Sequence, residues 1–122
     1  MKFAKAPPEN VELLDRLVGR LPGTVRRPMF GYAAYFAGGN LAVGLFADGI
    51  CMRLSDEDRE SAFKIPGVEP FAPMQGRVMK EYAFFTRAAL KDEKRLAAWT
   101  EKSVKFTLEK PKKAPTTKPK KR

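Results

Sequence analysis

Few residues in this sequence have the chemistry that catalysis or metal binding needs. The chain has no histidine, and its single cysteine is Cys51. Without histidine there is no Ser-His-Asp triad, no Cys-His dyad and no His-ligated zinc. One cysteine also excludes an internal disulfide and any metal site built from several thiolates. Cys51 alternates with Ile50 and Met52, so we expect it to be a small, partly buried hydrophobic side chain.

Four acidic residues lie close together in the sequence: Asp48, Asp56, Glu57 and Asp58. A divalent cation needs oxygens that converge in a preformed loop, and the sequence has no Asp-x-Asp-x-Asp-Gly motif. A hairpin turn at Asp48-Gly49 and a helix start after Ser55 explain the same acids without a metal. No glycine-rich phosphate loop is present either. We therefore expect no catalytic residue, no metal and no cofactor.

The strongest chemical signal is the charge of the C-terminal segment. The 122-residue chain has 24 basic and 14 acidic residues, a net charge of +10. Seven basic residues and no acidic one lie in residues 110–122: Lys110, Lys112, Lys113, Lys118, Lys120, Lys121 and Arg122. Residues 1–109 therefore contain 17 basic and 14 acidic residues. The segment has three prolines and no large apolar side chain, which predicts a disordered, locally extended tail.

A flexible cationic segment of this kind can bind phosphate backbones through charge alone. Such contacts do not read the base sequence, so we expect nonspecific affinity for DNA or RNA. The alternative is a tail that only keeps the protein soluble.

The hydrophobic pattern predicts the elements of residues 1–109. Apolar residues from 11 to 21 recur at helical spacing and end at Leu21-Pro22-Gly23. Residues 24–29 are compatible with a strand, and Pro28 suits a sheet edge. Residues 32–36, 41–46 and 50–54 are predicted to form three short antiparallel strands, with Asp48-Gly49 as the two central residues of the last turn.

The second half of the chain continues with helices and strands. Ser55 is expected to cap a helix that ends near residues 65–67, and residues 77–85 are a strand candidate. Residues 86–91 fit a turn or a short helical lead, and a last helix follows from Asp92. This order predicts a single α+β domain over residues 1–109, with helices packed on an antiparallel sheet.

Two groups of residues could form an interaction surface. Arg26 and Arg27 could bind an acidic partner, but such a pair more often solvates an edge strand and prevents its pairing with another sheet. Four aromatic residues follow: Phe30, Tyr32, Tyr35 and Phe36. The phenylalanines are expected in the core. Tyr32 and Tyr35 could instead be exposed and form an interaction face. Exposed tyrosine rings on a sheet could stack on nucleic-acid bases.

An ordered series of short motifs resembles the TfoX/Sxy family, N-terminal domain. The series is Met29-Phe30-Gly31-Tyr32, Tyr35, Gly38-Gly39, Leu45, Asp48-Gly49-Ile50, Met52-Arg53-Leu54, Pro66-Gly67-Val68-Glu69-Pro70-Phe71, Gly76, Met79, Tyr82 and Trp99. The similarity runs from about Val11 to Phe106. Tyr32 stands where a second glycine is usual in the family.

The resemblance implies a fold with three helices and an antiparallel sheet of about five strands, in the order α-β-β-β-α-β-β-α, and adds a strand at residues 69–74. Named members regulate competence genes in bacteria through protein partners and often carry a further C-terminal domain. Here we expect a stand-alone N-terminal domain. No catalytic residue follows from the resemblance.

These observations together predict a non-enzymatic regulatory or adaptor domain that acts through a protein partner, for which a transcription regulator is one candidate. Its basic tail is predicted to have affinity for nucleic acid. A small-ligand or peptide-binding module is the alternative. Neither a membrane-spanning run nor a secretion signal is evident in the sequence, so we expect a cytoplasmic protein. Both a monomer and a weak dimer are compatible with the pattern.

Overall fold

The computed structural model describes residues 6–29, 31–73 and 78–109. Its elements are α1 (Pro8–Val18), β1 (Thr24–Met29), β2 (Tyr32–Ala37), β3 (Asn40–Phe46), β4 (Gly49–Arg53), α2 (Asp56–Ala62), β5 (Val68–Pro70), β6 (Tyr82–Phe85), the short 3-10 helix η1 (Arg87–Leu90) and α3 (Glu93–Leu108). The predicted α+β class with three α-helices is confirmed. The sheet has six strands rather than about five, because residues 24–29 also join it.

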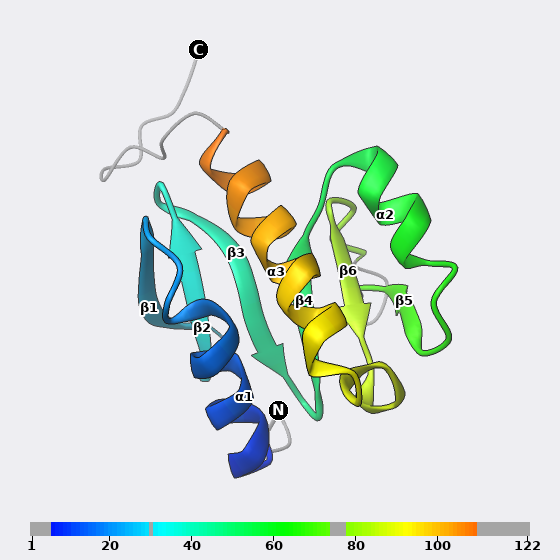
Figure 1. Cartoon of the computed structure of the whole chain (residues 1–122), viewed down its shortest axis with the longest axis horizontal. Coiled ribbons are helices and arrows are strands. Elements are labelled where there is room, and N and C mark those ends of the chain that lie inside the picture. The colour runs from blue at the N-terminus through cyan, green and yellow to red at the C-terminus, as the bar shows by residue number, and fades with distance from the viewer. Residues whose placement is uncertain (1–5, 30, 74–77, 110–122) are drawn as a thin grey trace.

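The six strands form one antiparallel sheet in the order β1-β2-β3-β4-β6-β5. Figure 1 shows β1 at one edge of this sheet and β5 at the other. Pro28 lies within β1 and pairs with Ala33 of β2. A proline cannot donate to a strand ladder, so it is tolerated in an edge strand whose N–H side faces outward. The proline therefore agrees with the edge position that the sequence indicated.

The β3–β4 hairpin corrects the predicted turn by one residue. Phe46 pairs with Gly49, so Ala47 and Asp48 are the two connecting residues, and Asp48-Gly49 is not the central pair. Ala47 adopts a φ of +51°, in the left-handed region that favours glycine. Gly49 is required for another reason: a Cβ there would lie 2.6 Å from Phe84 Cζ and from the Phe85 carbonyl oxygen.

Helices α1 and α3 cover one face of the sheet, as Figure 1 shows. Between them and the strands lies the main hydrophobic core, which includes Leu14, Leu17, Val43, Leu45, Ile50, Met52, Phe85 and Leu96. The amphipathic spacing of α1 accounts for this arrangement, because its buried leucines recur on one side of the helix. No described helix is long and apolar enough to cross a membrane.

A second, smaller cluster lies on the opposite face of the sheet and contains Ala34, Leu41, Cys51, Phe71 and Tyr82. Phe71 follows β5 and is 1% exposed. Its ring stacks on Phe84 at 5.6 Å between centroids and meets the edge of Phe46 at 5.4 Å. The chain after β5 thus returns over the far face of the sheet. Cys51 is completely buried there, as a small hydrophobic side chain.

Candidate functional site

Arg26 and Arg27 lie next to each other on the exposed edge strand β1, but their side chains point to opposite faces of the sheet. Arg26 reaches the helical face, where its Nε donates to Asp15 Oδ1 of α1 at 2.9 Å. Arg27 lies on the other face, with its guanidinium 5.4 Å from the centroid of the Phe36 ring. Among the described residues Arg27 has no carboxylate partner, so its charge is available to a binding partner.

Tyr32 and Tyr35 are interior residues. Tyr32 is 5% exposed and packs against Phe46, with 5.4 Å between ring centroids. Tyr35 is 6% exposed, and its hydroxyl donates to Asp15 Oδ1 at 2.7 Å. Of the four residues predicted as an interaction surface, the two arginines are therefore the exposed ones. A role of any of them in binding a partner stays a prediction.

Asp15 joins α1 to the first two strands through a single carboxylate oxygen, which accepts hydrogen bonds from both Tyr35 and Arg26. Burial raises the pKa of Asp15, but the two hydrogen bonds and the Arg26 charge outweigh it and hold the pKa below its usual value. The pKa of Tyr35 is raised, first by burial and then by its bond to the Asp15 carboxylate. The cluster is thus an ionic latch between helix and sheet edge.

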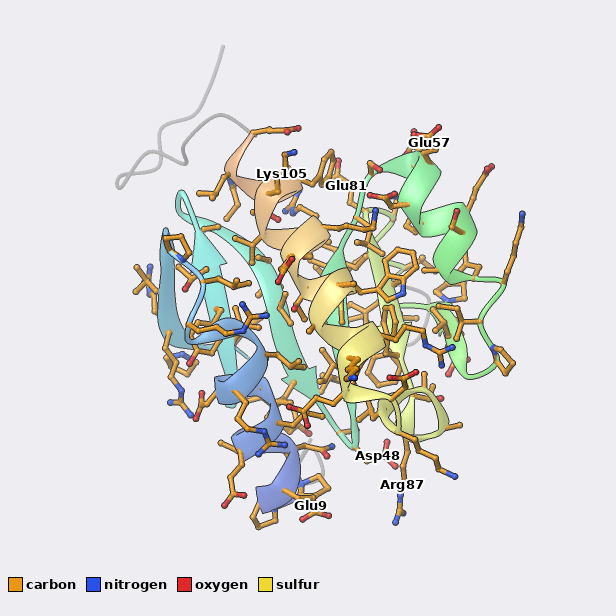
Figure 2. The ribbon with its side chains drawn as sticks, in the orientation of Figure 1. Glu9, Asp48, Glu57, Glu81, Arg87 and Lys105 are labelled. Atoms are coloured by element: carbon orange, nitrogen blue, oxygen red, sulfur yellow. The ribbon has the colours of Figure 1, made fainter. Side chains whose placement is uncertain are left out.

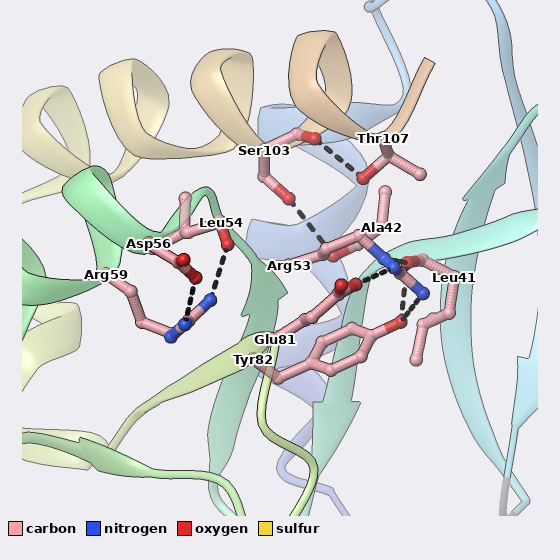
Figure 3. Close-up of polar contacts among 10 residues, drawn as sticks. All are labelled: Leu41, Ala42, Arg53, Leu54, Asp56, Arg59, Glu81, Tyr82, Ser103 and Thr107. Atoms are coloured by element: carbon pink, nitrogen blue, oxygen red, sulfur yellow. Dashed lines mark hydrogen bonds and ion pairs between the residues drawn. The ribbon is translucent and has the colours of Figure 1, made fainter. Parts of the chain in front are cut away.

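Arg53, at the end of β4, is the centre of a second polar network, shown in Figure 3. Its Nε donates to the Leu41 carbonyl at 3.1 Å, its Nη2 donates to the Tyr82 hydroxyl at 2.7 Å, and its Nη1 pairs with Glu81. The Tyr82 hydroxyl in turn donates to the same Leu41 carbonyl at 2.9 Å. Arg53 thereby links β4 to β3 and β6.

The chemistry of this network is that of a structural tie. The Arg53 side chain is 16% exposed, whereas Glu81 is 42% exposed. Burial raises the pKa of Tyr82 to about 12, although the Arg53 charge opposes the shift. Burial likewise raises the pKa of Cys51 to about 12. Both groups therefore stay protonated at neutral pH, and neither is a ready nucleophile or base there.

Three of the four acidic residues that were weighed as a metal site, Asp56, Glu57 and Asp58, lie in the first turn of α2, behind the predicted cap. Ser55 caps α2, with its Oγ accepting from the Asp58 amide at 3.1 Å. Asp56 pairs with Arg59 at 2.6 Å. Within residues 6–29, 31–73 and 78–109, no group of three or more His, Cys, Asp or Glu side chains could hold a metal ion.

Two shallow cavities border the C-terminal half of α3. One, of about 260 Å³, lies between α2 and α3 and is lined by Ser55, Asp58, Lys102, Lys105, Phe106 and Glu109. The other, of about 220 Å³, is lined by Leu21, Pro22, Glu101, Val104, Lys105 and Leu108. In Figure 2, Lys105 and Glu57 project from the same end of the molecule and Arg87 from the opposite end. Both cavities are smaller than the roughly 300–1,000 Å³ typical of small-molecule sites.

The seven basic residues predicted to bind nucleic acid (Lys110, Lys112, Lys113, Lys118, Lys120, Lys121 and Arg122) lie outside the described residues. Their role stays a prediction from the sequence.

Comparison with known proteins identifies the family. The sequence profile of the TfoX N-terminal domain matches residues 16–107, which include all six strands of the sheet and α3 except its last residue. No curated protein and no solved structure matches the chain. Because the profile spans well over half of the sequence, the chain belongs to the TfoX N-terminal domain family.

Proposed function

We propose that this protein is a non-enzymatic regulatory or adaptor domain that acts through a protein partner. The TfoX N-terminal domain is a regulatory or adaptor type of family and not a family of known enzymes. The ion pairs within the domain support the same view, because Arg26 pairs with Asp15 and Arg53 pairs with Glu81. Side chains held in this way stabilise a scaffold.

The observation that carries the proposal is the exposed strand β1. Val25 is 59% exposed, and the neighbouring Arg27 has no carboxylate partner among the described residues. Arginine is enriched at protein-binding surfaces, and an exposed apolar side chain on the same strand adds area that a partner can bury. This surface lies on a strand that is paired with β2 along its whole length, which favours binding without a large conformational change.

We further propose that the tail, residues 110–122, adds a sequence-independent affinity for nucleic acid. Seven cations with no acid among them exceed what solubility requires. If all seven neutralise phosphates, a plot of log affinity against log salt concentration for duplex DNA has a slope of about −6. The tail would then keep the adaptor near DNA or RNA while the folded part binds its partner.

The tail is tested by measuring binding of a random-sequence duplex to the full chain at several salt concentrations. A variant with the seven basic residues replaced by glutamine keeps the length and the prolines of the tail and serves as the matched control. We expect it to lose most of the salt slope. An unchanged slope would assign the binding to the folded part and contradict the role of the tail.

The partner is tested by affinity capture from native lysate, with the full chain and with the seven-glutamine variant, each with and without nuclease. A partner retained by both proteins after nuclease treatment supports an adaptor that binds protein directly. If every captured protein disappears with nuclease, the chain is a nucleic-acid-binding protein only, and the adaptor proposal fails.

The cavity beside Leu21 and Leu108 supports a second candidate, a module that binds a small apolar ligand or a peptide. Although Glu101 and Lys105 border it, the atoms that these six residues expose to the cavity are almost entirely apolar. A bound ligand would raise the free energy of unfolding by RT ln(1 + [L]/Kd). A thermal-shift screen of the glutamine variant tests this, and a hit that Leu108→Glu abolishes would favour the ligand-binding function.

A further inference from the structure

We propose that the open edge of β1 is a docking site for an extended segment of a partner protein, which adds to the sheet as a seventh strand with a carboxylate beside Arg27. This inference rests on the proposed adaptor function and names the class of partner segment. It starts from the position of Pro28 in the ladder.

Pro28 reveals which backbone groups of β1 face outward. It pairs with Ala33 but has no N–H, so its nitrogen lies on the side away from β2. Hydrogen-bonding direction alternates along a strand. Arg26 and Thr24 therefore present their N–H and C=O groups to the open edge, whereas Arg27 and Val25 direct theirs to β2. The edge offers two complete donor–acceptor pairs and the carbonyl of Pro28.

The side chains of β1 define what the added strand carries. Val25 and Arg27 share the sheet face opposite the helices, because Arg26 between them contacts Asp15 of α1. In an added strand, two side chains that are two residues apart lie on this same face, one beside Val25 and one beside Arg27. An apolar side chain complements Val25, which is 59% exposed. A carboxylate complements the charge of Arg27, which no described carboxylate pairs with.

A second copy of the chain fits the β1 edge less well than an acidic segment, and the other edge of the sheet is a poorer docking site. A second copy of the chain would bring the adjacent arginines of both β1 strands together, and like charges on neighbouring strands are destabilising. The other edge strand, β5, has three residues and ends at Pro70, which leaves a shorter backbone edge. In Figure 1 no described element lies outside β1.

The test uses the full chain, labelled with ¹⁵N, and the heptapeptide acetyl-Thr-Val-Thr-Glu-Thr-Val-Thr-amide as probe. We expect the largest amide shifts at Thr24 and Arg26. The same peptide with lysine in place of glutamate is expected to bind about tenfold more weakly. Arg27→Gln should remove this preference, whereas Arg87→Gln, at an exposed arginine of η1, should leave it unchanged.

A matched pair of variants isolates the backbone edge. Arg26→Ala and Arg26→Pro both lose the contact with Asp15, but only proline removes the outward N–H. Proline should weaken peptide binding about tenfold relative to alanine, through the lost bond and the bulk of its ring. Equal affinities of the two variants, or amide shifts centred on another element, would overturn the proposal.

A measurement on the peptide makes the test independent of any change in the protein's stability. N-methylation of the threonine amides, which face β1 in this register, should abolish binding, and methylation of the valine and glutamate amides should not. Equal effects of the two sets contradict strand addition. So does a failure of the unmodified peptide to shift any β1 amide at millimolar concentration.

Two further results would reassign the edge. A dimer in sedimentation that Arg26→Pro dissociates, but Arg26→Ala does not, would assign it to a second copy of the chain. Tighter binding at β1 of a single-stranded oligonucleotide than of the acidic peptide would assign it to nucleic acid. A partner captured equally by both Arg26 variants would sink the edge proposal and leave the adaptor function standing.

Discussion

The guanidinium of Arg53 binds Tyr82 in two ways. Its Nη2 donates to the phenol oxygen at 2.7 Å, and its charge lies 4.9 Å from the centroid of the same ring. The two residues are direct cross-strand partners of β4 and β6. β6 pairs in turn with the edge strand β5. The Arg53–Tyr82 pair therefore connects β6 and β5 to the rest of the sheet through β4.

Replacement of Arg53 by methionine removes a charged donor from Leu41 and Tyr82 as well as the ring contact. We expect a loss of about 2–3 kcal/mol in the free energy of unfolding, measured by urea denaturation. Arg53→Lys keeps the charge but not the planar guanidinium group, so its free energy of unfolding should lie between those of the wild type and of Arg53→Met. Arg27→Met is the control: the contact that the described residues show for its exposed guanidinium is the one with the Phe36 ring, so its loss should cost less than about 1 kcal/mol. Equal costs at both positions would contradict a tie at Arg53.

The Asp15 latch predicts sensitivity to acid. Its pKa is lower in the folded protein than in the unfolded chain, so its contribution is complete above the unfolded pKa of about 4 and is lost as the pH falls through the lower, folded value. Asp15→Asn should therefore destabilise the protein at pH 7 and reduce the loss of stability between pH 5 and pH 2. Glu57→Gln, at an exposed carboxylate on α2, is the control. Parallel pH curves for wild type and Asp15→Asn would show that the latch contributes nothing.

Tyr82 predicts a loss of stability at alkaline pH. Its pKa is raised to about 12 in the folded protein, so the phenol ionises first in the unfolded chain. The contribution is complete below the unfolded pKa of about 10 and declines as the pH rises toward 12, by up to about 2–3 kcal/mol. Tyr82→Phe should flatten this part of the curve, measured by urea unfolding from pH 9 to pH 11.5. A curve for Tyr82→Phe as steep as that of wild type would assign the alkaline loss to other groups.

Alanine substitutions at Gly49 and Gly31 should destabilise the protein for different reasons, a steric clash at Gly49 and an unfavourable backbone conformation at Gly31. A Cβ at Gly49 meets Phe84 Cζ and the Phe85 carbonyl oxygen at 2.6 Å, whereas at Gly31 it meets nothing within 4 Å but the φ is +81°. Gly49→Ala should cost about 2–3 kcal/mol through forced displacement of β6. Gly31→Ala should cost about 1–2 kcal/mol through strain alone. Thermal unfolding of both variants checks this order, and a larger cost at Gly31 would contradict it.

Local patterns in the sequence were sufficient to predict most of the fold. Alternating apolar residues marked β3 and β4, the Ser55 cap of α2 is confirmed by its bond from the Asp58 amide, and Pro28 indicated that residues 24–29 suit an edge. These signals act within a few residues, so no knowledge of the rest of the chain is needed. The family resemblance added a strand at residues 69–74. The structure has β5 at Val68–Pro70, which overlaps that range only at Glu69 and Pro70, and Met74 lies outside the described residues.

The hairpin turn and the last helix show where local patterns were insufficient. The pairing of Leu45 with Ile50 places Ala47 in the turn, although glycine would suit its positive φ better. On α3, the polar residues Thr100, Ser103 and Thr107 are fully buried. Their hydroxyls donate to backbone carbonyls, and that of Ser103 reaches Ala42 of β3, a contact that helical spacing does not reveal.

The exposed basic character of β1 and the absence of histidine chemistry could be read from the order of residues alone, because composition and strand alternation are properties of the chain itself. The sequence alone could not show which arginine of β1 pairs with a carboxylate of the same domain and which one is left to bind a partner. Arg26 meets Asp15 only because α1 packs across the first strands, and Arg53 meets Glu81 only because β6 returns beside β4. Charges distant in sequence become partners when the packing of apolar faces brings their elements together, and that packing sets the chemistry left at the surface.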